Sequence, residues 1–139
     1  MYNYNDLKNK VILVTGAAGL LGSEFVKSLL HQKGTVIALD SNLSGLKKLK
    51  NKISKNFINP KFYFYKCNIT KEKEMKNLIK KIANKYKRID GFVHCAGTNQ
   101  CLLSEKITLA NWQNIMSVNL TSAFIISKQI KKNLKKSKN

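Results

Sequence analysis

The chain has 139 residues, a hydrophobic fraction of 43% and a formal net charge of +19 at pH 7. This length and apolar content suit a single globular domain with its own core, and no apolar run approaches the roughly 18 residues of a membrane span. The first ten residues, MYNYNDLKNK, lack the apolar segment of a secretory signal. We therefore expect a cytoplasmic protein that makes no use of a membrane.

The positive charge comes almost entirely from lysine, since Arg88 is the one arginine of the chain. Specific recognition of a nucleic acid favours arginine, whose planar head pairs with phosphates and bases in two places at once. The lysines are also spread over all the predicted helices. We interpret the charge as a solvated surface and expect no specific nucleic-acid binding, with a basic nucleic-acid-binding protein as the alternative.

The cysteines show no pattern typical of a metal site. Cys67, Cys95 and Cys101 form no CxxC pair, and neither His31 nor His94 lies at zinc-finger spacing from them. We expect reduced, structural thiols and no bound metal.

Strand and helix patterns alternate along the first part of the chain. Residues 10–15 form a continuous apolar run, typical of a buried parallel strand. A helix should follow and end with Gly34 in the C′ position. Residues 35–39 predict a second buried strand, which ends at Asp40. The apolar positions at helical spacing in the first helix are Leu21, Phe25, Leu29 and Leu30.

A second helix should follow Asp40, with lysines on one face and Leu46, Leu49 and Ile53 on the other. The Asn59-Pro60 pair then breaks the chain. The aromatic-rich residues 61–66 predict a third strand.

Two more helices and one more strand complete the pattern. Thr70 is placed to cap the third helix, whose first turn carries acidic residues. Residues 89–95 predict a fourth strand, and residues 108–136 predict one long helix with apolar residues on more than one face. The buried face of the third helix should consist of Met75, Leu78, Ile79, Ile82 and Tyr86.

This order predicts an α/β fold with a doubly wound parallel sheet of about four strands and flanking helices. No repeat, linker or second domain interrupts residues 1–139. The long helix at 108–136 needs burial on two sides, and one sheet face covers only one of them. We therefore expect the isolated chain to associate or to be poorly soluble.

Three glycines spaced three apart, Gly16, Gly19 and Gly22, follow the first strand within the stretch TGAAGLLG. A strand, a glycine-rich turn and a helix N-terminus form an anion site, because free backbone N–H groups and the helix dipole point at the same place. Gly16 allows the tight turn, Gly19 lets a pyrophosphate approach the backbone, and Gly22 lets the helix pack on the strand. The pattern predicts a Rossmann-type dinucleotide site, with a tight turn that binds nothing as the alternative.

Asp40 strengthens this interpretation. It lies roughly 20 residues beyond the glycines, where such folds carry a ribose-binding acid. A carboxylate there accepts hydrogen bonds from the adenosine ribose and repels a 2′-phosphate. Ser41 and Asn42 follow it, and no arginine does. We therefore favour NAD over NADP, while a helix N-cap is the structural alternative for Asp40.

Four stretches together resemble the short-chain dehydrogenase/reductase family. They are VTGAAGLLG at residues 14–22, CNIT at 67–70, IDGFVHCAG at 89–97 and NWQNIMSVNLTSAF at 111–124. The resemblance covers nearly the whole chain and implies an NAD(P)-dependent oxidoreductase that transfers hydride between alcohols and carbonyls. It also implies a homo-oligomer through the 108–136 helix.

The resemblance implies a role for individual residues. Asn68, through its amide oxygen, and the backbone of Ile69 would meet the adenine edge, and Asn119 would be the catalytic residue that helps to order a water in a proton relay. The cofactor would be contacted by Gly16, Ala17, Ala18, Gly19, Leu20, Leu21, Gly22, Asp40, Asn68, Ile69, Cys95, Ala96 and Gly97.

The chain departs from the family pattern at several positions. Leu20 stands where the shorter branch of the family has a glycine, and the resulting TGxxGxxG form leaves the longer, sugar-nucleotide-modifying branch as an alternative. Asn68 replaces the usual Asp. His94 and Cys95 replace an Asn-Asn pair, and we interpret His94 as a buried strand residue.

The family's chemistry also needs a Ser and a Tyr-x-x-x-Lys pair on later elements, and no tyrosine lies after Tyr86. We therefore expect a domain truncated before the fifth strand, which holds the cofactor-binding half and is inactive alone. A nucleotide-binding or subunit-interaction module without catalysis is the alternative. The complete protein would act on a small alcohol or carbonyl compound, which these residues do not identify.

Overall fold

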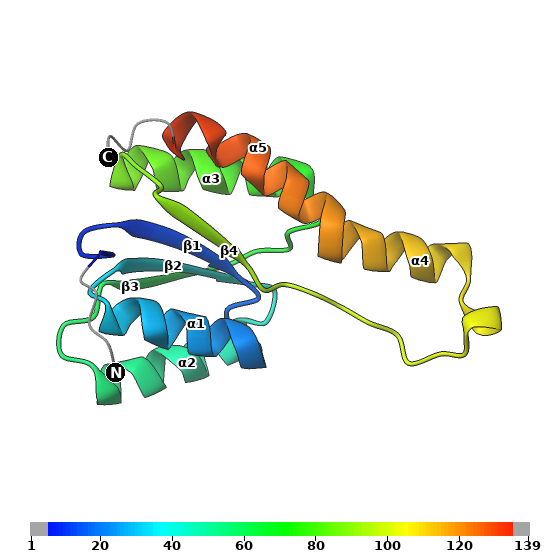
Figure 1. The fold of residues 1–139 in the computed structure, drawn as a ribbon, viewed down its shortest axis with the longest axis horizontal. Coiled ribbons are helices and arrows are strands. Elements are labelled where there is room, and N and C mark those ends of the chain that lie inside the picture. The colour runs from blue at the N-terminus through cyan, green and yellow to red at the C-terminus, as the bar shows by residue number, and fades with distance from the viewer. Residues whose placement is uncertain (1–5, 135–139) are drawn as a thin grey trace.

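The computed structural model describes residues 6–134, which form a parallel four-stranded sheet with helices on both faces (Figure 1). The strands are β1 (Val11–Thr15), β2 (Thr35–Asp40), β3 (Phe62–Lys66) and β4 (Gly91–His94). Their order in the sheet is β3-β2-β1-β4, so β1 and β2 are the inner strands. The expected α/β fold with a doubly wound sheet is confirmed.

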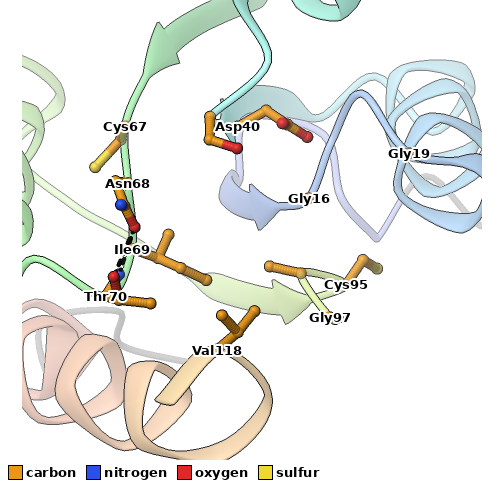
Figure 2. A pocket seen from close by; sticks show the side chains of 12 residues that line it. Gly16, Gly19, Asp40, Cys67, Asn68, Ile69, Thr70, Cys95, Gly97 and Val118 are labelled. Atoms are coloured by element: carbon orange, nitrogen blue, oxygen red, sulfur yellow. Dashed lines mark hydrogen bonds between the residues drawn. The ribbon is translucent and has the colours of Figure 1, made fainter. Parts of the chain in front are cut away.

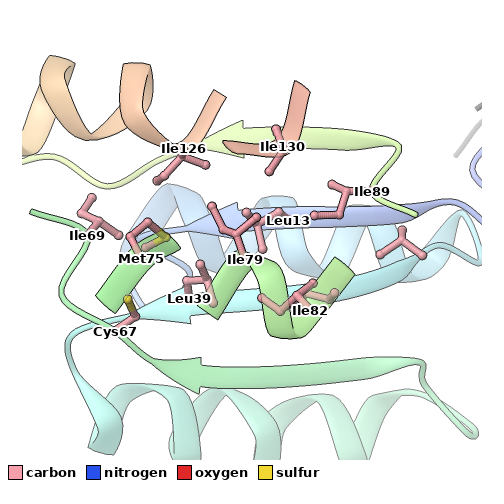
Figure 3. Close-up of a cluster of buried hydrophobic side chains, with 12 residues drawn as sticks. Leu13, Leu39, Cys67, Ile69, Met75, Ile79, Ile82, Ile89, Ile126 and Ile130 are labelled. Atoms are coloured by element: carbon pink, nitrogen blue, oxygen red, sulfur yellow. The ribbon is translucent and has the colours of Figure 1, made fainter. Parts of the chain in front are cut away.

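The helices divide between the two faces of the sheet. α1 (Leu20–His31) and α2 (Leu43–Asn56) cover one face, and α3 (Glu72–Tyr86) and α5 (Ser122–Leu134) cover the other (Figure 1). Because successive residues of a strand point to opposite faces, the sheet has a hydrophobic cluster on each side. Figure 3 shows the cluster under α3 and α5, where Met75 and Ile126 lie near Leu39 and Leu13.

After β4 the chain leaves the sheet and returns as one long helical segment (Figure 1). It passes through the short η1 (Ser104–Lys106), then α4 (Leu109–Met116), the π-helical turn η2 (Ser117–Thr121) and α5. The predicted helix at 108–136 is therefore found up to Leu134, and its last two positions lie outside the described residues. Within residues 6–134 no helix combines the length and the apolar character needed to span a membrane.

Two of the apolar positions at helical spacing in α1 are not buried. Leu21 and Phe25 are 68% and 47% exposed, whereas Gly22, Val26 and Leu30 are buried against the sheet. The reason is the tight approach of Gly22 to the turn before the helix, which directs positions four and eight residues later toward the core.

Two predicted helix ends are also wrong. The left-handed position after α1 is taken by Lys33, with φ 62°, and Gly34 follows it, donating its N–H to the Leu29 carbonyl at 3.0 Å. Thr70 does not cap α3, whose N-cap is Lys71 without a side-chain hydrogen bond. The Thr70 hydroxyl instead donates to Asn68 Oδ1 at 2.8 Å.

A buried carboxylate fixes the start of β1. Asp90 Oδ2 accepts the Val11 N–H at 2.8 Å, and Arg88 Nε donates to both oxygens of the same carboxylate at 2.9 and 2.8 Å. Burial by itself would raise the pKa of Asp90, but the hydrogen bonds from Arg88 and Val11 outweigh it and hold the pKa below its ordinary value of 3.8. This contact sets the register between β1 and β4 at the end of the sheet away from the glycine turn.

Candidate functional site

A cleft of about 230 Å³ opens where the four strands end (Figure 2). Open parallel sheets bind ligands at this edge, because turns from several strands converge there. Its lining comes from the turns after all four strands and from η2. The lining residues are Gly16, Gly19, Asp40, Ser41, Cys67, Asn68, Ile69, Thr70, Cys95, Ala96, Gly97 and Val118.

Most residues predicted to contact a cofactor line this cleft. The structure brings together Gly16, Gly19, Asp40, Asn68, Ile69, Cys95, Ala96 and Gly97. The other predicted residues, which are Ala17, Ala18, Leu20, Leu21, Gly22 and Asn119, do not belong to the lining. Ala17 is fully buried, and Leu20 and Leu21 are exposed at the start of α1.

The glycine turn is held by backbone contacts that leave no room for side chains. Gly16 has a φ of 62°, and a Cβ there would come within 2.6 Å of the Ala96 nitrogen. Gly22 in turn packs on Gly16. A Cβ at Gly19 would lie 3.2 Å from the Gly16 carbonyl oxygen, which is a milder contact. The turn therefore fastens β1, α1 and the end of β4 to one another.

The N-terminus of α1 offers unpaired backbone donors beside the cleft. Gly19 is the N-cap, no side chain caps the helix, and its first turn has no acid. The amides of Leu20, Leu21 and Gly22 have no partner inside the helix, as in any first turn. No lining side chain in the described part of the chain is basic. The positive end of α1 is therefore the feature of this cleft that suits a phosphate.

Asp40 is held in a fixed orientation at the end of β2. Its Oδ2 accepts the Ala18 N–H at 2.9 Å and its Oδ1 accepts the Asn42 N–H at 2.8 Å. Asn42, not Asp40, caps α2, because Asn42 Oδ1 accepts the Gly45 N–H at 2.9 Å. Each carboxylate oxygen keeps a further lone pair, so Asp40 can still accept hydrogen bonds from hydroxyl groups in the cleft.

Asn68 is engaged within its own turn. Its Oδ1 accepts from the Thr70 N–H at 3.0 Å and from the Thr70 hydroxyl at 2.8 Å (Figure 2). Both lone pairs of this oxygen are used in that way. The predicted contact of the Asn68 oxygen with an adenine amino group would have to replace one of these hydrogen bonds. The Asn68 amide nitrogen, the Thr70 hydroxyl oxygen and the Ile69 backbone are further polar groups of this wall.

Asn119 clamps the chain where it leaves the cleft. Its Oδ1 accepts the Thr98 N–H at 2.8 Å, and its Nδ2 donates to the Thr98 carbonyl at 3.0 Å. Both polar ends of the side chain are thus bound to one backbone residue. The predicted role of Asn119 in ordering a water would therefore have to use its backbone.

His94 lies behind the cleft wall and is half-buried. Its Nδ1 is 2.9 Å from the Thr15 hydroxyl oxygen. Burial lowers the pKa of His94 below its ordinary value of 6.5, although the backbone of Val118 and Asn119 partly offsets this effect. The ring is therefore neutral at pH 7.

The two thiols of the cleft are protonated at neutral pH. Burial, with a smaller contribution from Glu74, raises the pKa of Cys67 to about 11, and burial also raises the pKa of Cys95. A thiol in this state is a poor nucleophile and a poor metal ligand. In the described part of the chain no three His, Cys, Asp or Glu side chains gather as a metal site would require.

Four lining residues were not among the predicted cofactor contacts, namely Ser41, Cys67, Thr70 and Val118. Ser41, Cys67 and Thr70 are next to or near the predicted Asp40 and Asn68, so their place in the same turns was the available signal. Val118 enters the cleft because η2 packs against the end of β4, and no sequence periodicity indicates that contact.

Comparison with known proteins identifies related dehydrogenases and reductases. The family model described as short chain dehydrogenase matches residues 10–139. The chain is 32% identical over 116 residues to the NAD(+) 15-hydroxyprostaglandin dehydrogenase of Mus musculus, which covers 84% of this chain and 40% of that protein. It is 34% identical over 133 residues to the 3-oxoacyl-[acyl-carrier-protein] reductase FabG of Rickettsia typhi, covering 94% and 51%. The chain thus spans about half or less of the length of these relatives.

Solved structures share the fold. A short chain dehydrogenase from Shigella flexneri superposes with a TM-score of 0.88 at 24% identity, over 99% of this chain and 55% of the other. The ligand-free aldohexose dehydrogenase of Thermoplasma acidophilum gives a TM-score of 0.81 at 23% identity, over 97% of this chain and 48% of the other. At these sequence identities the similarity shows a shared fold and no more.

Proposed function

The chain belongs to the short-chain dehydrogenase family, and we propose that its 139 residues form the NAD-binding half of an oxidoreductase that transfers hydride between an alcohol and a carbonyl compound. The observation that carries this proposal is the cleft that joins the Gly16 turn, the α1 N-terminus and Asp40 at one edge of the sheet. These are the groups that a dinucleotide needs for its pyrophosphate and its adenosine ribose.

The residues present fit such a cofactor. The backbone around Gly16 and Gly19 can approach a pyrophosphate closely, and the first turn of α1 supplies its N–H donors. Asp40 would accept hydrogen bonds from the ribose hydroxyls, and Ile69 would lie against the adenine. The wall formed by Cys95, Ala96 and Gly97 would extend toward the nicotinamide, which accepts or gives the hydride when the cofactor is bound.

We propose NAD as the preferred cofactor because of the charge in the cleft. Asp40 is acidic, and no basic side chain lines the cleft within residues 6–134, so a 2′-phosphate would be repelled without compensation. The Mus musculus relative is named as an NAD(+) enzyme, which agrees with this preference.

We further propose that these residues bind the nucleotide without performing the reaction. The family uses a tyrosine as general acid–base on a later element, and no tyrosine follows Tyr86 in this chain. The thiols of Cys67 and Cys95 are protonated near neutral pH and are poor substitutes. General acid–base catalysis contributes about 10²- to 10⁴-fold to such reactions, so turnover by the chain alone should be weak or absent.

Calorimetric titration with NAD and NADP tests the proposal. We expect NAD to bind more tightly than NADP. Asp40→Asn should weaken NAD binding about tenfold and reduce the difference in affinity between NAD and NADP. Glu105→Gln is the matched control, since Glu105 is an exposed acid of η1 outside the cleft. Folded protein that binds no NAD at millimolar concentration would refute nucleotide binding, and carbonyl reduction by the purified chain would refute its inactivity.

A second proposal is that the long helical segment mediates association between subunits. The side chains of Leu109, Trp112, Leu120 and Phe124 are each more than half exposed on α4, η2 and α5. Clustered exposed apolar residues mark interaction surfaces. We expect dimers or larger species in sedimentation, and Trp112→Glu should shift them toward monomer. Ile58→Glu, at an exposed apolar residue after α2, is the control, and a monodisperse monomeric wild type would contradict the proposal.

A further inference from the structure

A buried hydroxyl links the ends of the two neighbouring strands β1 and β4. Thr15 and His94 end these strands and are paired in the parallel register. The fully buried Thr15 Oγ1 lies 2.9 Å from His94 Nδ1, and the Ala96 N–H donates to the same oxygen over a longer 3.5 Å. Gly16 follows Thr15 directly, so this hydroxyl joins the glycine turn to the opposite wall of the cleft.

The hydrogen-bond pattern indicates where the proton of the ring resides. After accepting from Ala96, Thr15 Oγ1 still has its proton and one lone pair, so it can donate to His94 Nδ1 or accept from it. The donating arrangement is favoured because the backbone of Val118 and Asn119 raises the His94 pKa, as acceptors of a proton on the other ring nitrogen would. A neutral ring that accepts at Nδ1 carries its proton on Nε2. Nε2 is buried and makes no hydrogen bond of good geometry to the described residues. The backbone of Val118 and Asn119 lies against the ring.

We propose that His94 is a positioning residue of the nucleotide site: as a neutral ring it accepts the Thr15 hydroxyl proton and holds the glycine turn against β4, and its protonation weakens nucleotide binding. This inference rests on the proposed NAD binding. Its test therefore includes a measurement that needs no nucleotide.

Protonation should disturb the turn because the Thr15 hydroxyl proton then loses its acceptor on the ring. A doubly protonated ring donates from Nδ1, so the Thr15 hydroxyl proton must turn away from the ring inside a fully buried site. The backbone offers little room to adjust, since a Cβ at Gly16 would already stand 2.6 Å from the Ala96 nitrogen. A shift of Thr15 or Ala96 is thus passed to the turn that would hold the pyrophosphate.

The groups that face the His94 ring are uncharged. They are the Thr15 hydroxyl from β1, the Phe92 ring from β4 with centroids 5.7 Å apart, and the η2 backbone at Val118 and Asn119. The neighbouring Cys95 thiol is neutral because burial raises its pKa. Burial therefore dominates the titration of His94, and the loss of binding should begin below pH 6.5.

The first measurement is the tautomer and titration of His94 by ¹⁵N NMR of the free chain. We expect the proton on Nε2 and a pKa below 6.5. His31, the other histidine, lies on α1 beside Phe57 and far from the cleft lining, and His31→Asn assigns the signals. A proton on Nδ1, or a His94 pKa above 6.5, would overturn the inference whatever the chain binds.

The second measurement is the NAD dissociation constant between pH 5.5 and 7.5. Wild type and His31→Asn should lose affinity toward pH 5.5, by no more than about tenfold because the His94 pKa lies below 6.5, while His94→Asn should show a flat profile. If His94→Asn does not fold, His94→Gln serves the same purpose. An unchanged pH dependence in the folded variant would contradict this inference alone. Absence of NAD binding at every pH would contradict both this inference and the proposed function.

Discussion

Gly22 stands so close to Gly16 that a Cβ atom added to Gly22 would lie 2.1 Å from the Gly16 carbonyl oxygen. The contact involves backbone on both sides, so neither partner can rotate away as a long side chain would. It brings the first turn of α1 directly onto the turn that follows β1. The direction of α1, and with it the place of its free N–H groups, depends on these two residues.

Gly22→Ala should therefore destabilise the fold by about 3 kcal/mol or more, because the new methyl group overlaps fixed backbone. Urea unfolding followed by circular dichroism measures the effect. Gly19→Ala is the matched control: its Cβ would meet the same oxygen at 3.2 Å, and its φ of −77° suits any residue. Equal losses for the two variants would show that the close contact does not govern α1.

The buried carboxylate of Asp90 should make the stability fall in acid. Its pKa is lowered in the folded state, so its contribution is present above pH 3.8 and is lost as the pH falls through the lower, folded-state pKa. Asp90→Asn should cost about 2 kcal/mol at pH 7 and flatten the profile between pH 4 and 2, measured by urea unfolding at each pH. Asp6→Asn, at an exposed acid before β1, should retain the wild-type profile.

Asn119→Ala should free the segment after β4. The variant removes both hydrogen bonds to Thr98, and amide hydrogen exchange at Thr98 should become about tenfold faster or more, as expected for the loss of about 1.4 kcal/mol. Asn114→Ala, at an exposed position of α4, is the control on the same helical segment. Unchanged protection at Thr98 would mean that other contacts hold the segment.

Thiol labelling should separate the three cysteines. Cys101 is exposed, Cys95 is half-buried and Cys67 is buried. Burial raises the pKa of both Cys95 and Cys67. Ellman's reagent at pH 8 should modify one thiol per chain quickly, and Cys101→Ser should abolish this fast phase. NAD should slow the labelling of Cys95 without affecting Cys101. A fast phase that survives in Cys101→Ser would contradict this order of exposure.

The order of elements, the glycine turn and the place of Asp40 followed from local patterns. Buried parallel strands are apolar throughout, glycines mark the turn where backbones touch, and the ends of parallel strands meet at one edge. These three regularities were enough to bring Gly16 and Asp40 to the same cleft before any coordinates, whereas Ile69 and Ala96 were placed there by the family resemblance.

The differences arose where a tertiary contact decides between local options. Helical spacing groups Phe25 with the other apolar positions of α1, but the Gly22–Gly16 contact turns α1 so that Val26 is buried and Phe25 is exposed. The π-helical turn η2 has no sequence signature. It carries Asn119, which accepts the Thr98 N–H from the segment after β4. Such choices depend on which residues a segment packs against in three dimensions, and the periodicity of apolar residues in the sequence does not specify that packing.

The inner position of β1 also has a consequence for the order of events during synthesis. Thr15 meets His94 across 79 residues of sequence, so β1 has one open edge until β4 has been made. At about 5–20 residues per second, translation needs roughly 4 to 16 s to cover that separation. For that time the nascent chain exposes one unpaired edge of an apolar strand, the kind of edge that can pair with another chain.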